Sequence, residues 1–247
     1  MRNNFGDRRR NLEMYASDLA YIHDAGFSDY ILQAAPGLLQ ILQNNRVTNG
    51  LVVDLGCGGG RWARVLNDRR YAVLGVDASV DFVRLARANA PRSKFVAADL
   101  WTLRLPECEA VTAIGEVLNY GRRRTLLGLF RRVFQALGPG GVFLFDLAGP
   151  DRIPPGGSRR VWAAGSDWAV LSESAGSGDR LHRSIISFRK AGRYYRRSEE
   201  IHEVQLYDPK YALAALETAG FKARKQRAFG DFRLPAGIHG FVAVKPR

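Results

Sequence analysis

A short apolar strand that ends in an acid and runs directly into a glycine-rich turn constrains the fold more than any other feature. Residues 51–60 read Leu-Val-Val-Asp-Leu-Gly-Cys-Gly-Gly-Gly, and a segment compatible with a helix follows them. Glycine permits positive φ angles and a close approach of the backbone to a ligand. A buried strand, a glycine turn and a helix in this order therefore predict an α/β sheet that binds a ligand at its first turn.

Two alternative interpretations of this glycine turn must be considered: a nicotinamide-binding turn and an ordinary tight turn without a ligand. The spacing of the glycines argues against the nicotinamide-binding turn. A nicotinamide-binding fold carries Gly-x-Gly-x-x-Gly, in which the third glycine lets the helix pack on the strand. Counting from Gly56, that third place is Arg61. The dinucleotide fingerprint therefore fails, and an ordinary tight turn without a ligand remains as the second alternative.

Beyond residue 51, short apolar runs alternate with helix-compatible segments, which is typical of parallel sheets with crossover helices. Ser79 is a suitable N-cap for the helix after the second run, and Asp208 followed by Pro209 is a suitable start for a late helix. We expect a Rossmann-like, doubly wound, mostly parallel α/β sheet of seven strands at residues 51–54, 72–76, 95–98, 110–114, 141–147, 221–229 and 238–244.

The segments outside this alternation predict two additions to the core. Residues 1–48 indicate helices that lead into the sheet. After the fifth strand, a stretch that includes Pro154 and Pro155 marks a loop out of the core, and residues 159–206 then alternate in strand fashion between glycine breaks. We therefore expect a small antiparallel β cap inserted after strand 5 at residues 151–206, a core of residues 1–150 and 207–247, and an N-terminal helical lid at residues 1–48.

Three acids stand at the ends of the first three expected strands. Asp54, Asp77 and Asp99 fall at the carboxyl ends of adjacent strands, where open α/β sheets bind ligands. A carboxylate at the end of the second strand can accept hydrogen bonds from both hydroxyls of a ribose, which makes Asp77 the preferred ribose contact. Each acid alone is also compatible with a helix N-cap or a turn.

Three segments resemble the cofactor motifs of class I S-adenosylmethionine-dependent methyltransferases: Val-Asp-Leu-Gly-Cys-Gly-Gly-Gly, Gly-Val-Asp-Ala-Ser at residues 75–79, and Ala-Ala-Asp-Leu at residues 97–100. The resemblance spans residues 51–148. It implies that the glycine loop approaches the methionine part of the cofactor, that Asp99 takes the adenine amino group beside Leu100 or Trp101, and that Gly115 faces the ammonium. The cofactor site implied in this way consists of Asp54, Gly56, Gly58, Gly60, Asp77, Asp99, Leu100 and Gly115.

The flanking segments carry a weaker, topological resemblance. The expected cap is similar to the antiparallel cap of small-molecule methyltransferases, including those that methylate amino sugars and glycine-like amines. The helical segment from Tyr15 to Tyr21 looks like the lead-in that closes over the cofactor in those families. Tyr15 is therefore expected as a lid contact, with an aromatic side chain packed on the core as the alternative.

The segment after the fourth strand supplies the first candidates for the acceptor side. A sulfonium donor carries a good leaving group, so the protein mainly has to align the reacting atoms in line and exclude water. Glu116 can accept a proton or orient an amine, and Tyr120 can wall the acceptor. His182 and His202 are second candidates, since each can face a cavity from a cap strand. The alternatives are a loop acid, a packed aromatic and two structural histidines.

The composition of the chain argues against a membrane partner and a metal site, and it favours one cellular location. Of 247 residues 46% are hydrophobic, and no apolar run approaches the ~20 residues that cross a bilayer, so no membrane partner is expected. The basic start Met-Arg-Asn-Asn-Phe-Gly-Asp-Arg-Arg-Arg lacks the features of a secretory signal, and two cysteines fit a reducing compartment, so a cytoplasmic location is expected. No grouping with the spacing of metal ligands occurs, and no metal is expected.

The net charge of +13 keeps a nucleic-acid reading open. Aromatics alternate with arginines over residues 193–197, as base-stacking surfaces do, but no Asn-Pro-Pro-Tyr or Asp-Pro-Pro-Tyr follows the fourth strand. The preferred interpretation is a methyltransferase that uses S-adenosylmethionine to methylate nitrogen or oxygen of a small-molecule acceptor. An RNA or other nucleic-acid methyltransferase and a non-catalytic cofactor-binding protein remain the alternatives. Sequence leaves the acceptor and the oligomeric state open.

Overall fold

The computed structural model describes residues 15–153 and 156–247. The expected residues 1–14 of the lead-in and the loop prolines Pro154 and Pro155 lie outside the described residues. The helices are α1 (Ser17–Gly26), α2 (Asp29–Asn44), α3 (Arg61–Asp68), α4 (Val80–Asn89), α5 (Arg123–Ala136) and α6 (Pro209–Thr218), with short 3-10 turns η1 (Val117–Tyr120) and η2 (Pro150–Arg152).

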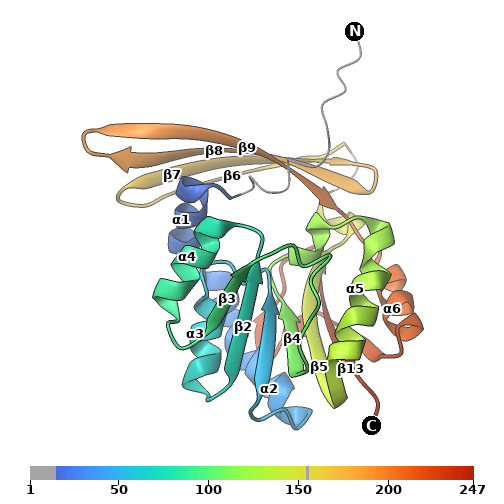
Figure 1. Ribbon diagram of the computed structural model, residues 1–247. Helices are drawn as coiled ribbons and strands as arrows, with labels where there is room; N and C mark the ends of the chain where they lie inside the picture. Colours follow the sequence, from blue (N-terminus) through green and yellow to red (C-terminus); the bar gives the residue numbers. More distant parts are fainter. Residues whose placement is uncertain (1–14, 154–155) are drawn as a thin grey trace.

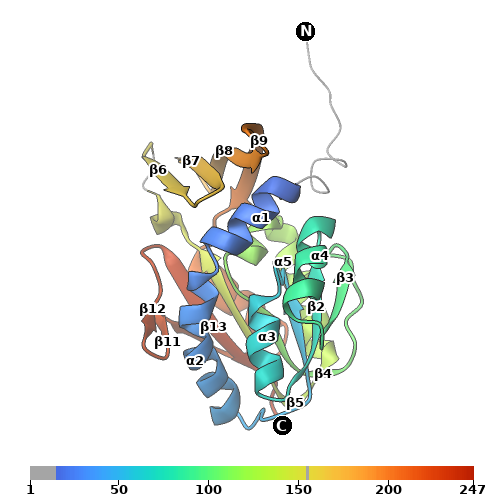
Figure 2. The ribbon, with the colours of Figure 1, turned by 90° about the vertical axis from the view of Figure 1, so that its left-hand side faces the viewer.

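The strands form a large sheet and a four-stranded sheet (Figure 1) and a small hairpin (Figure 2). Their bounds are β1 (Leu51–Leu55), β2 (Ala72–Asp77), β3 (Lys94–Ala97), β4 (Cys108–Ala113), β5 (Leu137–Ala148), β6 (Ser158–Ala164), β7 (Trp168–Ser177), β8 (Arg180–Ala191), β9 (Tyr194–Gln205), β10 (Lys222–Gln226), β11 (Ala228–Phe229), β12 (Phe232–Arg233) and β13 (Ile238–Val244).

The large sheet has seven strands in the order β10-β13-β5-β4-β1-β2-β3. The neighbours from β5 to β3 pair in parallel, and β13 runs antiparallel to both β5 and β10. The order reverses between β1 and β4, so the carboxyl ends of these two strands border a crevice. The expected Rossmann-like, mostly parallel seven-stranded sheet is confirmed.

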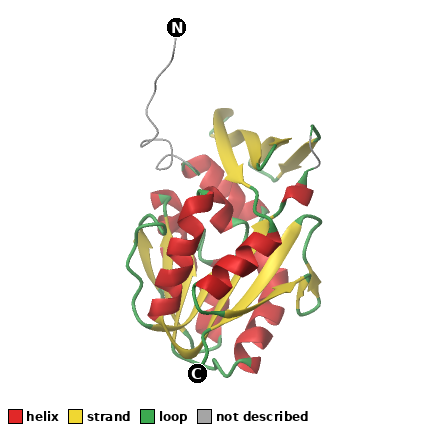
Figure 3. Ribbon diagram, turned by 90° about the vertical axis from the view of Figure 1, so that its right-hand side faces the viewer, coloured by secondary structure: helices red, strands yellow, loops and turns green. Residues whose placement is uncertain are grey.

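Helices cover both faces of the sheet (Figures 1 and 3). On one face, Leu126, Phe130 and Val133 of α5 and Leu216 of α6 pack on the strands, because their spacing puts them on one side of each helix. On the other face α2, α3 and α4 bury a second apolar cluster that includes Leu38, Trp62 and Val83. Both faces of the strands are therefore apolar, and polar side chains gather at the strand ends.

The four-stranded antiparallel sheet β6-β7-β8-β9 lies over the carboxyl edge of the large sheet, with α1 between the two (Figure 2). Leu19 and Ile22 of α1 pack against Trp168, Val170 and Ile185 of this sheet. We call the four strands the cap. It follows β5 in the chain, as expected, and α6 leads back to the large sheet.

Most of the expected strands lie close to their predicted bounds, and two expected helix N-caps are present. Ser79 caps α4 by accepting a hydrogen bond from the Phe82 amide at 3.3 Å, and Asp208 caps α6 through the Lys210 amide at 2.8 Å. The strand expected over residues 221–229 is divided into β10 and the first strand of the β11–β12 hairpin. Within the described residues, no helix combines the length and apolarity that a membrane span requires.

Candidate active site

The glycine turn after β1 is tied to the end of β2. Gly56, Gly58 and Gly60 all have positive φ, at 67°, 51° and 77°. The Gly58 amide donates to Asp77 Oδ2 and the Ser79 amide donates to Asp77 Oδ1, both at 2.9 Å. One carboxylate therefore fixes both the glycine turn and the start of α4, and each of its oxygens retains a lone pair for a ligand.

A cavity of about 600 Å³ lies above this turn at the carboxyl ends of β1 to β4. An added Cβ at Gly58 or Gly115 would meet no atom within 4 Å, so the backbone is open to a ligand at both positions. The sequence-predicted residues that line this cavity are Tyr15, Gly56, Gly58, Asp77, Asp99, Leu100, Gly115, Glu116 and Tyr120, together with Trp101. An open glycine turn, strand-end acids and a flanking indole suit a nucleoside that carries an amino acid tail.

Two expected cofactor contacts lie elsewhere. Gly60 does not line the cavity, and its missing side chain instead lets α3 approach α4, since an added Cβ would stand 2.9 Å from Ala86. Asp54 is buried beneath the turn, where Thr112 donates a hydrogen bond to its Oδ1 at 2.7 Å. Burial raises the pKa of Asp54 to about 7, and the nearby Asp77 contributes to the same upward shift. Gly60 and Asp54 therefore pack behind the glycine turn, on the side away from the cavity, and do not line the cavity.

The backbone after β4 is held by an acid that sequence reasoning missed. Asp146 of β5 is buried and accepts the Gly115 amide at 3.0 Å and the Glu116 amide at 2.6 Å. The Tyr30 hydroxyl donates to the same carboxylate at 2.7 Å, and burial raises the pKa of Asp146 to about 6. Glu116 has a φ of 61°, a strained conformation for a residue other than glycine. The signal for Asp146 was a lone acid within the apolar run Val-Phe-Leu-Phe-Asp-Leu.

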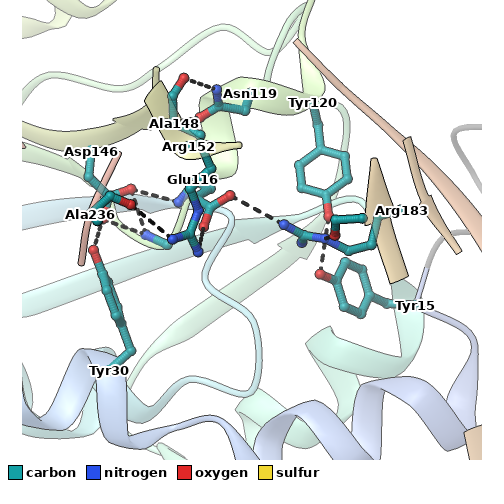
Figure 4. A network of polar contacts seen from close by, with 12 residues as sticks. Tyr15, Tyr30, Glu116, Asn119, Tyr120, Asp146, Ala148, Arg152, Arg183 and Ala236 are labelled. Carbon is teal, nitrogen blue, oxygen red and sulfur yellow. Dashed lines mark hydrogen bonds and ion pairs between the residues drawn. The ribbon is translucent and has the colours of Figure 1, made fainter. Parts of the chain in front are cut away.

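Two arginines hold the Glu116 carboxylate (Figure 4). Arg152 Nη2 lies 3.2 Å from Glu116 Oε1, and Arg183 Nη2 of β8 lies 3.4 Å from Oε2. The Glu116 and Arg152 side chains are 17% and 15% exposed, so little water screens this pair. Sequence reasoning named neither arginine, because both are distant from Glu116 along the chain.

A chain of polar side chains joins the lid to the cap. The hydroxyls of Tyr15 and Tyr120 are 3.2 Å apart, Tyr120 Oη is 3.1 Å from His202 Nδ1, and His202 Nε2 is 2.9 Å from Glu200 Oε2. A carboxylate only accepts, so Nε2 donates to Glu200. In the neutral imidazole Nδ1 then accepts from Tyr120, which leaves Tyr15 to donate to Tyr120. Burial raises the pKa of both tyrosines. His202 is fully buried and does not line the cavity, but it contacts Tyr120 and Tyr15, which do.

Glu200 also fixes the start of the lid. Its two carboxylate oxygens accept the backbone amides of Tyr15 and Ala16, at 2.7 and 3.0 Å. The Ser79 hydroxyl donates to the Tyr15 carbonyl at 2.9 Å, so α4 of the core contacts the same residue. The beginning of α1 is therefore held between the cap and the core, and Tyr15 stands over the cavity as expected for a lid contact.

A second cavity, of about 290 Å³, lies under the cap. It shares part of its wall with the first cavity through Tyr15, His23, Phe27, Glu116 and Arg183. Burial lowers the pKa of His23 to about 4, so its imidazole is neutral at pH 7. The two cavities are neighbours that meet at Glu116.

The expectation that His182 faces a cavity is corrected by the strand register. Side chains alternate between the two faces of a strand, and the face of β8 toward the second cavity carries Leu181, Arg183 and Ile185. His182 is exposed on the opposite face, paired across the strands with Glu203. His182 therefore lies outside both cavities.

The sheet order and the cavity over its carboxyl edge define an α/β protein with a ligand site at the point where the strand order reverses. Residues 52–141 match the family described as a methyltransferase domain. A trans-aconitate 2-methyltransferase from Variovorax paradoxus is 32% identical over 146 residues, which cover 58% of this chain and 54% of the relative. The chain thus spans about half the length of this curated relative. Over residues 52–141 the chain is therefore similar to methyltransferase domains, and its fold and cavity agree with that similarity.

Solved structures share the fold at low identity. An S-adenosylmethionine-dependent methyltransferase from Clostridium acetobutylicum superposes with a TM-score of 0.79 at 18% identity, over 92% of this chain and 99% of that one. A sugar N-methyltransferase from Streptoalloteichus superposes with a TM-score of 0.77 at 20% identity, over 100% and 98%. Since these superpositions cover nearly the whole chain, they extend over the cap as well as the core.

Proposed function

We propose that this protein transfers a methyl group from S-adenosylmethionine to a nitrogen or oxygen of a small-molecule acceptor held beneath the cap. The observation that carries the proposal is the shared wall of the two cavities at Tyr15, Glu116 and Arg183. A cofactor in the larger cavity and an acceptor in the smaller one would meet at that wall. Trans-aconitate and sugar methyltransferases among the similar proteins support a small acceptor.

On the cofactor side, we assign the ribose to Asp77 and the adenine to Asp99, Leu100 and Trp101. Asp77 keeps acceptor capacity after its two backbone hydrogen bonds, and the other three residues line the same cavity. The open backbone at Gly58 and Gly115 suits the amino acid end of the cofactor. The bound cofactor supplies an activated methyl group with a good leaving group.

On the acceptor side, the protein's residues position the acceptor and accept a proton. Glu116 is anchored by two arginines and so orients the acceptor better than it serves as a free base. The Tyr120 hydroxyl can accept a proton from the acceptor as it passes its own to His202 Nδ1, and Glu200 stabilises the resulting imidazolium. His202 therefore acts through Tyr120, as a positioning residue. The cap and the lid lie over this space and would limit the access of water to it.

The proposal is tested by incubating the protein with S-adenosylmethionine and a panel of small amines, alcohols and carboxylic acids. The readout is an acceptor whose mass increases by one methyl group, with S-adenosylhomocysteine formed in equal amount. The Tyr120→Phe variant, which keeps the ring and removes the hydroxyl, serves as the matched comparison. Methylation of an added RNA, with no small molecule of the panel modified, would contradict the assignment of a small acceptor.

A further inference from the structure

One row of side chains crosses the inner face of the cap from edge to edge. Arg159 of β6 pairs with Ser174 of β7, Ser174 with Arg183 of β8, and Arg183 with His202 of β9. Residues paired in this way point to the same face of a sheet. The first three of them line the smaller cavity. Two guanidinium groups therefore flank one serine on the roof of the space assigned to the acceptor.

The charged groups around this cavity are mostly cationic. Arg152, Arg159 and Arg183 line it, and Glu116 is the one acid among its lining residues in the described chain. His23, which also lines it, is neutral at pH 7. The lining thus carries two positive charges in excess.

The arginines have hydrogen-bonding capacity left over. The ion pairs of Glu116 with Arg152 and Arg183 measure 3.2 and 3.4 Å, longer than the ~2.7–2.9 Å typical of charge-assisted hydrogen bonds. Arg183 Nε donates to Ser174 Oγ at 3.3 Å, which leaves further N–H donors of this partly buried guanidinium unused. Arg159 has no ion-pair partner among residues 15–153 and 156–247. An anion would complete these contacts.

The rest of the wall limits the size and polarity of the acceptor. Leu19, Val161, Val170, Leu181 and Ile185 surround the row, and the volume of about 290 Å³ is at the lower end of the range for small-molecule sites. A small apolar body with a charged end fits such a lining.

We infer that the acceptor is a small anionic molecule whose carboxylate or phosphate group binds between Arg159 and Arg183, with its apolar body against the cap strands. The inference rests on the proposed function and specifies its substrate class. Arg159 and Arg183 lie two strands apart in the cap, and neighbouring strands are about 4.8 Å apart. The anionic end lies toward Arg159, and the atom to be methylated lies toward Glu116 and Tyr120.

The test is a calorimetric titration in the presence of saturating S-adenosylhomocysteine. The probes are phenylacetate, phenyl phosphate, phenylacetamide and phenethylamine, which share a ring and differ in the end group. We expect one of the two anions to bind at least about tenfold more tightly than the amide and the amine. The anion that binds more tightly distinguishes a carboxylate acceptor from a phosphate acceptor.

Two neighbouring arginines provide matched variants. Arg159→Gln removes the charge on the cavity face, and Arg160→Gln removes an equal charge on the outer face, where Arg160 pairs with Glu173. Arg159→Gln should weaken anion binding about tenfold. Arg160→Gln should leave it unchanged, and Arg159→Lys should recover part of it.

Three outcomes overturn the inference: the amide or the amine binds as tightly as the anions, neither anion binds, or the two Gln variants lose anion affinity equally. The binding of S-adenosylhomocysteine alone is measured on every variant. If the unmodified protein does not bind S-adenosylhomocysteine, the proposed function is rejected. Normal binding without a preference for anions would reject only the inference about the acceptor.

Discussion

Replacing Asp54 with asparagine removes a charge that the fold buries beneath the glycine turn. Burial raises the pKa of this acid from 3.8 to about 7. At about 1.4 kcal/mol per pKa unit, the charged form destabilises the folded state by about 4 kcal/mol. Because the folded state binds the proton more tightly than the unfolded state does, the free energy of unfolding falls as pH rises from about 4 to about 7. The Asp54→Asn variant has no group to titrate at this position and escapes this loss.

Urea unfolding of both proteins at pH values from about 5 to about 8 measures the effect. The substituted side chain keeps an oxygen that can accept a hydrogen bond from the Thr112 hydroxyl, but its NH₂ group can cost a constant amount at every pH, so the informative quantity is the pH dependence. The stability of the variant relative to the unmodified protein should rise by about 2–3 kcal/mol over this range. The exposed substitution Asp68→Asn is the control. Parallel pH profiles for Asp54→Asn and the unmodified protein would refute the reasoning.

Asp77→Asn should weaken S-adenosylhomocysteine binding by about tenfold or more, because it removes the charged acceptor at the assigned ribose site, and an unchanged calorimetric Kd would reject that assignment. Gly60→Ala should lower the free energy of unfolding by about 1–3 kcal/mol through its positive φ and its contact with Ala86, whereas Gly58→Ala, whose Cβ meets open space, should lower it less. Equal losses of stability would contradict that difference. Tyr120→Phe should reduce kcat by about a hundredfold and alter its pH profile with little change in cofactor affinity, and an unchanged kcat would remove Tyr120 from proton transfer.

The fold was predictable because its signals are local. The glycine turn, the apolar runs and the caps at Ser79 and Asp208 each act within a few residues, and the structure has the expected elements at these places. The cap also follows from local alternation and glycine breaks. The exception is the β11–β12 hairpin, whose two-residue strands are too short to produce a periodic pattern.

The site was only partly predictable, because its details depend on contacts distant in sequence. Arg183 reaches Glu116 across 67 residues, and Asp146 likewise accepts hydrogen bonds from backbone amides about 30 residues away along the chain. Alternation along β8 places His182 and Arg183 on opposite faces, but the face that turns inward is set by the packing of α1 under the cap. Asp54 and Gly60 could not be placed either, because their positions in the motif do not show whether they face the cavity or pack against the core behind the glycine turn.

Binding of the demethylated product tests the central claim most directly. The protein is titrated calorimetrically with S-adenosylhomocysteine, and NAD is titrated in parallel as a control for an unspecific nucleotide site. The account predicts saturable binding of one S-adenosylhomocysteine per chain, with no binding of NAD. Failure to bind S-adenosylhomocysteine, or a preference for NAD, would contradict the assignment of the cavity above Gly56 and Gly58 to the cofactor.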